Sequence, residues 1–190
     1  MSIEQIFVKE RERYVQFLVE TRSKLTTENP KTVGELLVSV NNDTIPYPFR
    51  YLRVDVMSSL PDGTPKPYEV KIDLDPSFEG KGFNFGSFVV EVYPFTWNSI
   101  QILFNQPIKN VQHLESWITR WLDLGDNNPA NPLNLSHAIH SFTPVDQFGE
   151  WWYLTGDFGT APYDALVEFI ELLADEEMTR IVIKSGESNA

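Results

Sequence analysis

The chain has 190 residues, of which 42% are hydrophobic and 13% aromatic, and it carries a formal net charge of −12. These values predict a soluble globular protein with enough apolar side chains for a packed core. Because the sequence contains no cysteine, it excludes disulfides, thiolate metal ligands and a cysteine nucleophile.

The acidic charge also narrows the classes of partner. The 15 basic residues are dispersed rather than gathered in a stripe, so we expect no binding to nucleic acid. The charge is typical of a protein kept soluble by its acidity, and the alternative is an acidic face that attracts a basic protein partner. The charged segment Met1–Glu12 is unlike a signal peptide, and no apolar run suffices for a membrane span. We therefore expect a cytoplasmic protein without a membrane partner.

Apolar residues recur at helical spacing from Ile3 to Leu25, which predicts a helix that ends before Asn29-Pro30. Three segments then alternate with a period of two and are expected to be strands, at residues 33–40, 52–56 and 68–74. In the second of them we expect the apolar side chains to face inward and Arg53 and Asp55 to face solvent. Glu35 alternates in the first with Leu36 and Val38, which we expect on the packed face.

The middle of the chain predicts two strands and a helix. The strands, Ser87–Tyr93 and Ser99–Asn105, carry the fewest charges and are expected near the centre of the sheet. The glycines of residues 80–82 are interpreted as turn residues, because no phosphate-loop pattern accompanies them. A helix is expected from Val111 to about Leu124, with Asn110 as its N-cap. The polar segment 125–136 is an alternative domain boundary, although we favour a single domain.

The last third predicts a β-β-α-β unit. Strands His137–Thr143 and Glu150–Asp157 are expected to form a hairpin in which Thr143 pairs with Glu150, so that His140 lies opposite Tyr153. An amphipathic helix that buries four apolar residues and a strand at Ile181–Ile183 follow, and this strand is expected to run parallel to the one before the helix. The buried residues of the helix are Leu166, Phe169, Ile170 and Leu173.

The predicted fold is therefore α+β. It comprises a mostly antiparallel sheet of about six to eight strands, an N-terminal helix, and two amphipathic helices on one face of the sheet. We expect one domain over residues 1–184 and a disordered tail at residues 185–190.

The sequence contains no recognisable catalytic, metal or cofactor motif, and no such group is predicted. His137 and His140 would point to opposite faces of a strand, which argues against a shared zinc ion. His140 is interpreted as a hydrogen-bonded structural residue; the alternative is a general base oriented by Asp157, with Ser136 or Ser141 as nucleophile.

Two residues of the corner before the last helix, Asp157 and Thr160, are expected to cap the amides at the helix start. A small anion or polar ligand held by those amides is the alternative. The residues singled out as a candidate ligand or partner site are His140, Trp151, Tyr153, Asp157 and Thr160.

Many aromatic residues, a negative charge and the lack of a catalytic pattern together predict a non-enzymatic, acidic interaction protein of bacterial type that binds a protein partner. Composition and size favour an immunity-like or chaperone-like class. The alternative is a small-molecule-binding protein or hydrolase with a pocket around His140, Trp151, Tyr153 and Asp157. A homodimer is a third hypothesis, should the first helix expose its apolar stripe.

Overall fold

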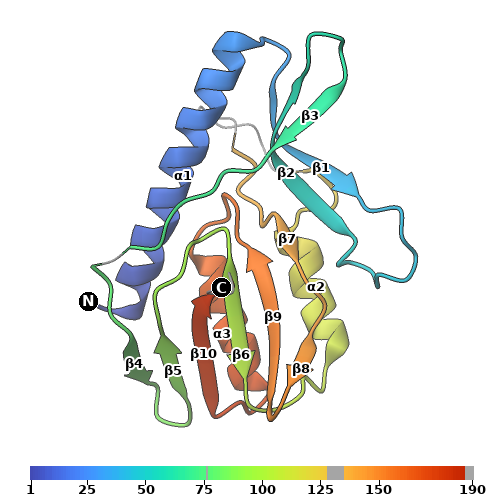
Figure 1. Cartoon of the computed structure of the whole chain (residues 1–190). Helices are drawn as coiled ribbons and strands as arrows, with labels where there is room; N and C mark the ends of the chain where they lie inside the picture. Colours follow the sequence, from blue (N-terminus) through green and yellow to red (C-terminus); the bar gives the residue numbers. More distant parts are fainter. Residues whose placement is uncertain (76, 128–134, 187–190) are drawn as a thin grey trace.

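The computed structural model describes residues 1–75, 77–127 and 135–186, which form three helices and two sheets (Figure 1). In chain order the elements are α1 (Ile3–Glu28), β1 (Val33–Ser39), β2 (Tyr51–Ser59), β3 (Pro65–Tyr68), β4 (Lys81–Asn84), β5 (Val89–Val92), β6 (Ile100–Phe104), α2 (Val111–Trp121), β7 (Ser141–Phe142), β8 (Asp146–Phe148), β9 (Trp151–Asp157), α3 (Asp164–Asp175) and β10 (Arg180–Ser185).

Helix α1 is long enough to contact both sheets. It begins with a capping box between Ser2 and Gln5 and ends at Asn29, before the proline, as predicted. Near its start Phe7 packs edge to face on Phe95 of the larger sheet region, with ring centroids 6.2 Å apart. Just past its end, the side chain of Asn29 donates to the Ser59 carbonyl at 3.0 Å. The helix therefore ties the two sheets together along one side.

The smaller sheet contains β1, β2 and β3 in that order, all antiparallel. Strands β2 and β3 form a hairpin, but the predicted strand at residues 68–74 is wrong, because β3 ends at Tyr68. Beyond it, the backbone N–H of Val70 donates to the carboxylate of Asp55, and its carbonyl accepts from the side chain of Asn98. Side chains thus take the hydrogen bonds that a neighbouring strand would otherwise supply.

The larger sheet has seven strands in the order β4-β5-β10-β6-β9-β7, and β8 also pairs with β9. Strand β10 lies between β5, to which it is parallel, and β6, to which it is antiparallel. Since β9 is also antiparallel to β6, β9 and β10 are parallel, and the predicted strand-helix-strand unit around α3 is confirmed. The glycine link predicted at residues 80–82 is wrong in part, because Gly82 belongs to edge strand β4.

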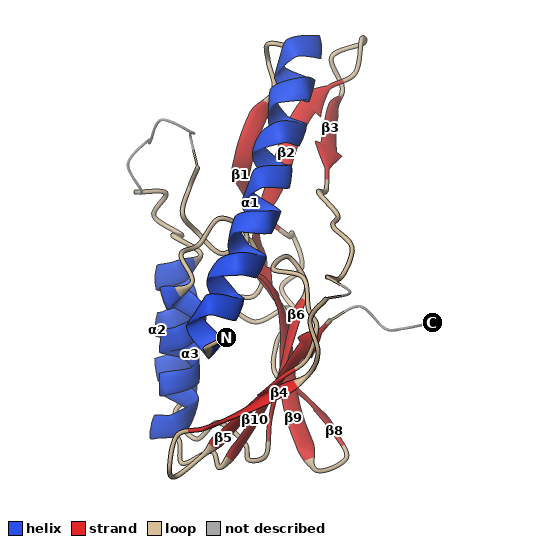
Figure 2. Ribbon diagram, turned by 90° about the vertical axis from the view of Figure 1, so that its left-hand side faces the viewer, coloured by secondary structure: helices blue, strands red, loops and turns tan. Residues whose placement is uncertain are grey.

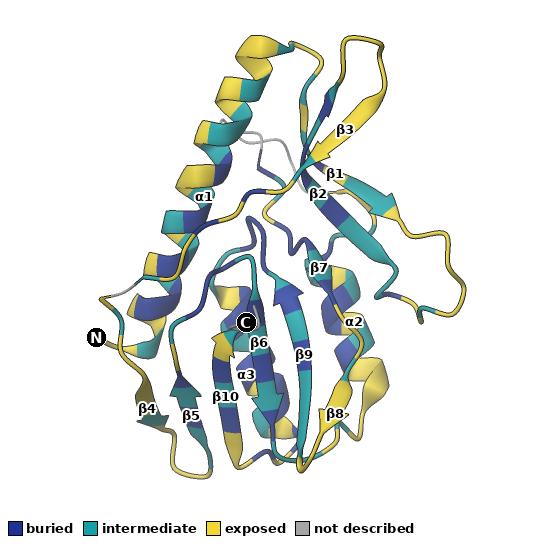
Figure 3. Ribbon diagram, viewed as in Figure 1, coloured by how far each residue is buried: buried dark blue, intermediate teal, exposed yellow. Residues whose placement is uncertain are grey.

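Helices α2 and α3 lie on one face of this sheet (Figure 2). Between helices and sheet, the ring of Trp117 packs 4.7 Å from Phe169 and 5.3 Å from Phe142, and Phe142 contacts Phe158 at 5.4 Å. Buried residues are concentrated along this interface (Figure 3), including the four predicted for α3. Asn110 caps α2 as predicted, although the helix ends at Trp121.

The α+β class and the two helices on one sheet face are confirmed, with the first three strands forming a sheet of their own. Of the predicted tail, Ser185 belongs to β10 and residues 187–190 lie outside the described residues. Most of the alternative boundary segment also lies outside them. None of the helices in the described ranges has the length and apolar character required to cross a membrane.

Candidate functional site

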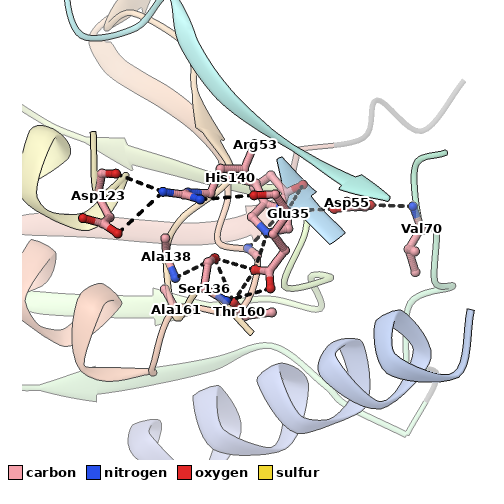
Figure 4. Close-up of polar contacts among 12 residues, drawn as sticks. Glu35, Arg53, Asp55, Val70, Asp123, Ser136, Ala138, His140, Thr160 and Ala161 are labelled. Carbon is pink, nitrogen blue, oxygen red and sulfur yellow. Dashed lines mark hydrogen bonds and ion pairs between the residues drawn. The ribbon is translucent and has the colours of Figure 1, made fainter. Parts of the chain in front are cut away.

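A buried group of charged side chains lies where the two sheets meet (Figure 4). Glu35 comes from β1, Asp55 from β2, His140 from the segment before β7 and Asp157 from the end of β9. Glu35, Asp55 and His140 are each less than 5% exposed. Charged side chains at this depth require partners, because an unpaired buried charge is very costly.

In the smaller sheet, the carboxylates of Glu35 and Asp55 lie close together because the pairing of β1 with β2 is interrupted at Glu35. Gly34 pairs with Val56 and Leu36 pairs with Val54, so that Glu35 lies opposite Asp55 in the register without a ladder pair of its own. The backbone of Glu35 has a φ of 51°, in the left-handed region that glutamate seldom adopts. As a result Glu35 is buried and Leu36 is 40% exposed, the reverse of the predicted faces.

The imidazole of His140 lies between these two carboxylates. Its Nδ1 is 2.7 Å from Asp55 Oδ1, and its Nε2 is 3.0 Å from Glu35 Oε1. Burial alone would lower its pKa, but the charge of Asp157 and the hydrogen bonds to Asp55 and Glu35 outweigh this and raise the pKa to about 10. The ring is therefore a cation at neutral pH, and both of its nitrogens donate hydrogen bonds.

The carboxylate of Glu35 has four hydrogen-bond donors. Ser136 donates from its N–H at 2.8 Å and from its Oγ at 2.6 Å, and the hydroxyl of Thr160 and the ring of His140 donate as well. Burial tends to raise the pKa of Glu35, but the hydrogen bond and charge of His140, with the two hydroxyl groups, lower it to about 2. Glu35 is thus ionised across the physiological range.

The carboxylate of Asp55 is also fully used. The hydroxyl of Tyr14 donates to its Oδ1 at 2.8 Å, the same oxygen that faces His140, and Val70 N–H donates to its Oδ2. Burial, followed by the charges of Asp157 and Asp55, raises the pKa of Tyr14 well above its usual value. Helix α1, strand β2 and the segment before β7 therefore share one hydrogen-bonded network.

A second buried cation, Arg53, links β2 to the end of α2. Its guanidinium donates to the carbonyls of Leu122 at 3.1 Å, Glu35 at 3.1 Å and Asp123 at 2.9 Å, and to the carboxylate of Asp126 at 3.0 Å. The carbonyls at the C-terminal end of a helix are the negative end of its dipole, which favours a cation there. Arg53 and Asp55, predicted to face solvent, are thus both buried.

Asp157 differs from the other carboxylates of the group. Its Oδ1 accepts from Gly159 N–H at 2.8 Å, while its Oδ2 is 3.7 Å from His140 Nδ1, beyond hydrogen-bonding distance. Burial raises its pKa, the charge of His140 opposes this, and the charge of Asp55 adds to the rise, so that the pKa reaches about 7. Its side chain is 19% exposed and borders a hollow of about 420 Å³ between β2, β3 and β9.

The geometry limits what this group can do. A general base requires a free nitrogen near substrate, whereas both nitrogens of His140 donate to carboxylates and the ring is 1% exposed. Asp55, His140 and Asp157 have potential metal-ligand atoms within 4.8 Å of one another. Binding a metal through Nδ1 would require His140 to lose its proton and its bond to Asp55, which a pKa of about 10 opposes.

The structure separates the five residues singled out from the sequence. His140, Asp157 and Thr160 belong to the buried group, whereas Trp151 and Tyr153 lie further along β9. Trp152 and Leu154 pair with the buried Phe104 and Ile102, so alternation places Trp151 and Tyr153 on the sheet face opposite α2 and α3. Thr160 donates to Glu35, and α3 has no side-chain cap, so its predicted capping role is wrong. Asp157 does accept an amide of the corner, that of Gly159.

The predicted hairpin register is also wrong. Ser141 pairs with Asp157, and it is Asp146 of β8, not His140, that pairs with Tyr153. The extra strand β8 and a turn at Gly149, with a φ of 61°, return the chain before β7 can pair with the start of β9. His137 is exposed and lies outside any strand, with a φ of 52°. Strand β7 therefore begins at Ser141, four residues later than predicted.

Sequence patterns missed Glu35, Arg53 and Asp55, because charges that alternate with apolar residues are typical of a solvated sheet face. They also missed the polar role of Tyr14, because its helical spacing marks only a buried side chain. Comparison of the chain with models of protein families, with curated proteins and with solved structures finds no match.

Proposed function

We propose that this chain is a non-enzymatic binding protein for another protein, in the immunity-like or chaperone-like class. The proposed docking surface is the face of the seven-stranded sheet opposite α2 and α3, here called the open face. We expect the protein to act in the cytoplasm and not to bind nucleic acid, since its net charge of −12 repels phosphate.

The observation that carries the proposal is an apolar row across the open face. Val182 of β10 pairs with Leu103 of β6, and Leu103 pairs with Tyr153 of β9. Trp151 lies two residues before Tyr153 on the same side of β9, and Phe148 of β8 pairs with it. Phe148 is 80% exposed and the other four are half-buried. A solvated sheet face is usually polar, so a continuous apolar row indicates an interaction site.

The chemistry at the edge of this row supports the same proposal. The guanidinium of Arg180 lies 5.3 Å from the ring centroid of Trp151 and pairs with Glu91 at 2.7 Å. Tryptophan, tyrosine and arginine contribute most often to binding energy at protein interfaces. Here the ion pair and the cation–π contact hold Arg180 and Trp151 in place before a partner arrives, which reduces the entropy lost on binding.

The buried group supports a binding role over hydrolysis. The catalytic alternative requires His140 to accept a proton beside a nucleophile, but His140 is charged, enclosed and bonded on both sides. Ser136, one of the two serines considered as nucleophile, donates its hydroxyl to Glu35 at 2.6 Å. These contacts fit a group that stabilises the junction of the sheets.

The proposal is tested with single charge insertions on exposed phenylalanines. Phe148→Glu places a carboxylate on the open face, and Phe17→Glu places one on α1, where Phe17 is 47% exposed. We expect the wild type and Phe17→Glu to capture the same stoichiometric partner from the source cell, and Phe148→Glu to lose it. A Val182→Glu variant, checked for folding by circular dichroism, should lose it as well.

Equal recovery by all four proteins would place the partner elsewhere on the molecule. Failure of the wild type to retain any stoichiometric partner, together with a monodisperse monomer in light scattering, would contradict the proposal itself. A concentration-dependent dimer that Phe148→Glu dissociates would instead identify a second copy of the chain as the occupant of the open face.

A further inference from the structure

The hollow between β2, β3 and β9 is lined by carboxylates and one aromatic ring. Its lining includes Asp55 and Asp157, together with Pro67 and Tyr68 of β3. Its volume of about 420 Å³ exceeds the space that one side chain occupies, and it is open to solvent. Glu69 at its border adds a third carboxylate, which contributes to raising the pKa of Asp157.

The charges around this hollow are not balanced from within. Asp55 receives hydrogen bonds from Tyr14, Val70 and His140, and His140 shares its single charge with Glu35 as well. Arg53 borders the hollow, but its guanidinium is bonded to the carbonyls near the end of α2. The Nζ of Lys66 lies 4.8 Å from the ring centroid of Tyr68, so an arginine beside this ring would compete with Lys66 for it.

Asp157 is the carboxylate left without a matching cation. In the described part of the chain its ion-pair partner is His140, whose Nδ1 is 3.7 Å away and already bonded to Asp55. Lys71 pairs with Glu69 at 3.6 Å, but both side chains are 69% exposed, so this pair is well solvated. A cation from a partner would therefore gain more binding free energy at Asp157 than at the exposed Glu69.

One residue of the hollow, Asp157, is on the side of β9 that forms the open face. Trp151, Tyr153 and Asp157 project from the same side of β9, because side chains alternate along a strand. Six residue steps at about 3.3 Å each place Asp157 about 20 Å from Trp151. A standard protein interface of about 800 Å² per partner spans such a distance. One partner can therefore cover the apolar row and reach the hollow.

We propose that the protein partner inserts an arginine side chain into this hollow, where its guanidinium pairs with Asp157 and lies beside the ring of Tyr68. This inference rests on the proposed function and adds the chemistry of the contact. Arginine fits better than lysine, because its planar guanidinium offers several donors to carboxylates, stacks on aromatic rings and is the more weakly hydrated cation.

The chemistry is tested first without any partner, using N-acetyl-arginine N-methylamide as the probe and the corresponding citrulline derivative as its neutral control. In ¹⁵N-resolved NMR of the full chain, we expect saturable shifts at the amides of Tyr68, Asp157 and Gly159 with the arginine probe at millimolar concentrations. The citrulline probe should give none. Asp157→Asn should abolish the shifts, and it keeps an oxygen acceptor for Gly159 N–H, so the corner is preserved.

The second arm uses the captured partner. We expect Asp157→Asn to weaken its binding at least about tenfold, because a desolvated charge in the partner loses its counterion. Lys71→Gln, at the exposed rim, serves as the matched control and should change the affinity by less than about threefold.

The outcomes separate the two proposals. If the arginine probe binds but no stoichiometric partner is found, the arginine site would stand and the proposed function would be contradicted. A partner bound equally by the wild type and Asp157→Asn, with no difference between the arginine and citrulline probes, would retain the proposed function and overturn the inference. Displacement of the arginine probe by Mg²⁺ or Zn²⁺ at lower concentration would replace arginine by a metal ion and overturn it too.

Discussion

His140 provides the most demanding test of the buried group, because one imidazolium there faces two carboxylates. The change His140→Gln removes the charge and keeps a side chain that can donate hydrogen bonds. It leaves Glu35 and Asp55 buried, each less than 5% exposed, without their shared cation. Removing one partner of a buried ion pair costs about 3–5 kcal/mol.

The pKa of His140 gives the same magnitude independently. A shift from 6.5 to about 10, at about 1.36 kcal/mol per unit, corresponds to about 4–5 kcal/mol in favour of the charged native form. The lowered pKa of Glu35 describes the same interaction from its other end and is not added to it. We therefore expect His140→Gln to lower the free energy of unfolding by about 3–5 kcal/mol at pH 6, a large part of an ordinary total of about 5–15 kcal/mol.

The pH dependence follows from the direction of the shift. Between pH 6.5 and 10 the native state retains a proton on His140 that the unfolded state has released. The free energy of unfolding therefore falls as the pH rises through this window, and the contribution is complete below pH 6.5. The difference in free energy of unfolding between wild type and His140→Gln should therefore shrink steadily from pH 6.5 to 9.

Urea unfolding at a series of pH values measures this difference. Both proteins carry Asp157→Asn in this assay, because the pKa of Asp157 depends on the charge of His140 and its titration would otherwise differ between them. His113→Gln, at an exposed histidine on α2, is the matched control and should match the wild type at every pH. The double variant His140→Gln with Glu35→Gln should lose less free energy of unfolding than the sum of the two single losses, by at least about 1 kcal/mol. A loss below about 1 kcal/mol at pH 6, or a difference that stays constant up to pH 9, would refute this account of the group.

Three further predictions concern its neighbours. Asp157→Asn should raise the free energy of unfolding at pH 8 by about 2 kcal/mol, less than the full pKa shift implies because the side chain is 19% exposed. The raised pKa of Asp157 makes the native state lose stability between about pH 4 and pH 7, and urea unfolding of this variant should lack that loss. A lower free energy of unfolding at pH 8 would contradict the assignment. Arg53→Lys should cost about 2–4 kcal/mol in denaturant unfolding, because an ammonium cannot reach all the oxygens that the guanidinium bonds; retention of full stability would show that these bonds are dispensable. Tyr14→Phe should cost about 1.5–3 kcal/mol through the lost bond to Asp55, and an unchanged melting temperature would count against a buried contact there.

Much of the fold could be predicted because apolar side chains follow the period of their element. In α3, Leu166, Phe169, Ile170 and Leu173 lie on one side at helical spacing, and all are buried. Strands β5 and β6 likewise bury alternate residues against the helices. Such patterns distinguish only a packed face from a solvent face. That is enough to predict an element that packs on one side only.

The buried group could not be predicted in the same way. Its hydrogen bonds join His140 to Asp55, 85 positions away in the sequence, and to Glu35, 105 positions away. Alternation in β2 assigned Asp55 to solvent, yet a second packed layer lies on that side and supplies Tyr14 from α1. Nothing local marks such a layer, and the left-handed backbone of Glu35 departs from the alternation itself.

The place of β10 in the larger sheet has a consequence for how the chain reaches its native state. β10 separates β5 from β6, so these two earlier strands cannot complete their pairing until residues 180–185 have been synthesised. Pairings between segments so distant in sequence form slowly. Until then β5 and β6 would present apolar, unpaired edges, which are prone to aggregate. Nascent chains that stop before β10 should therefore depend on chaperones or be degraded.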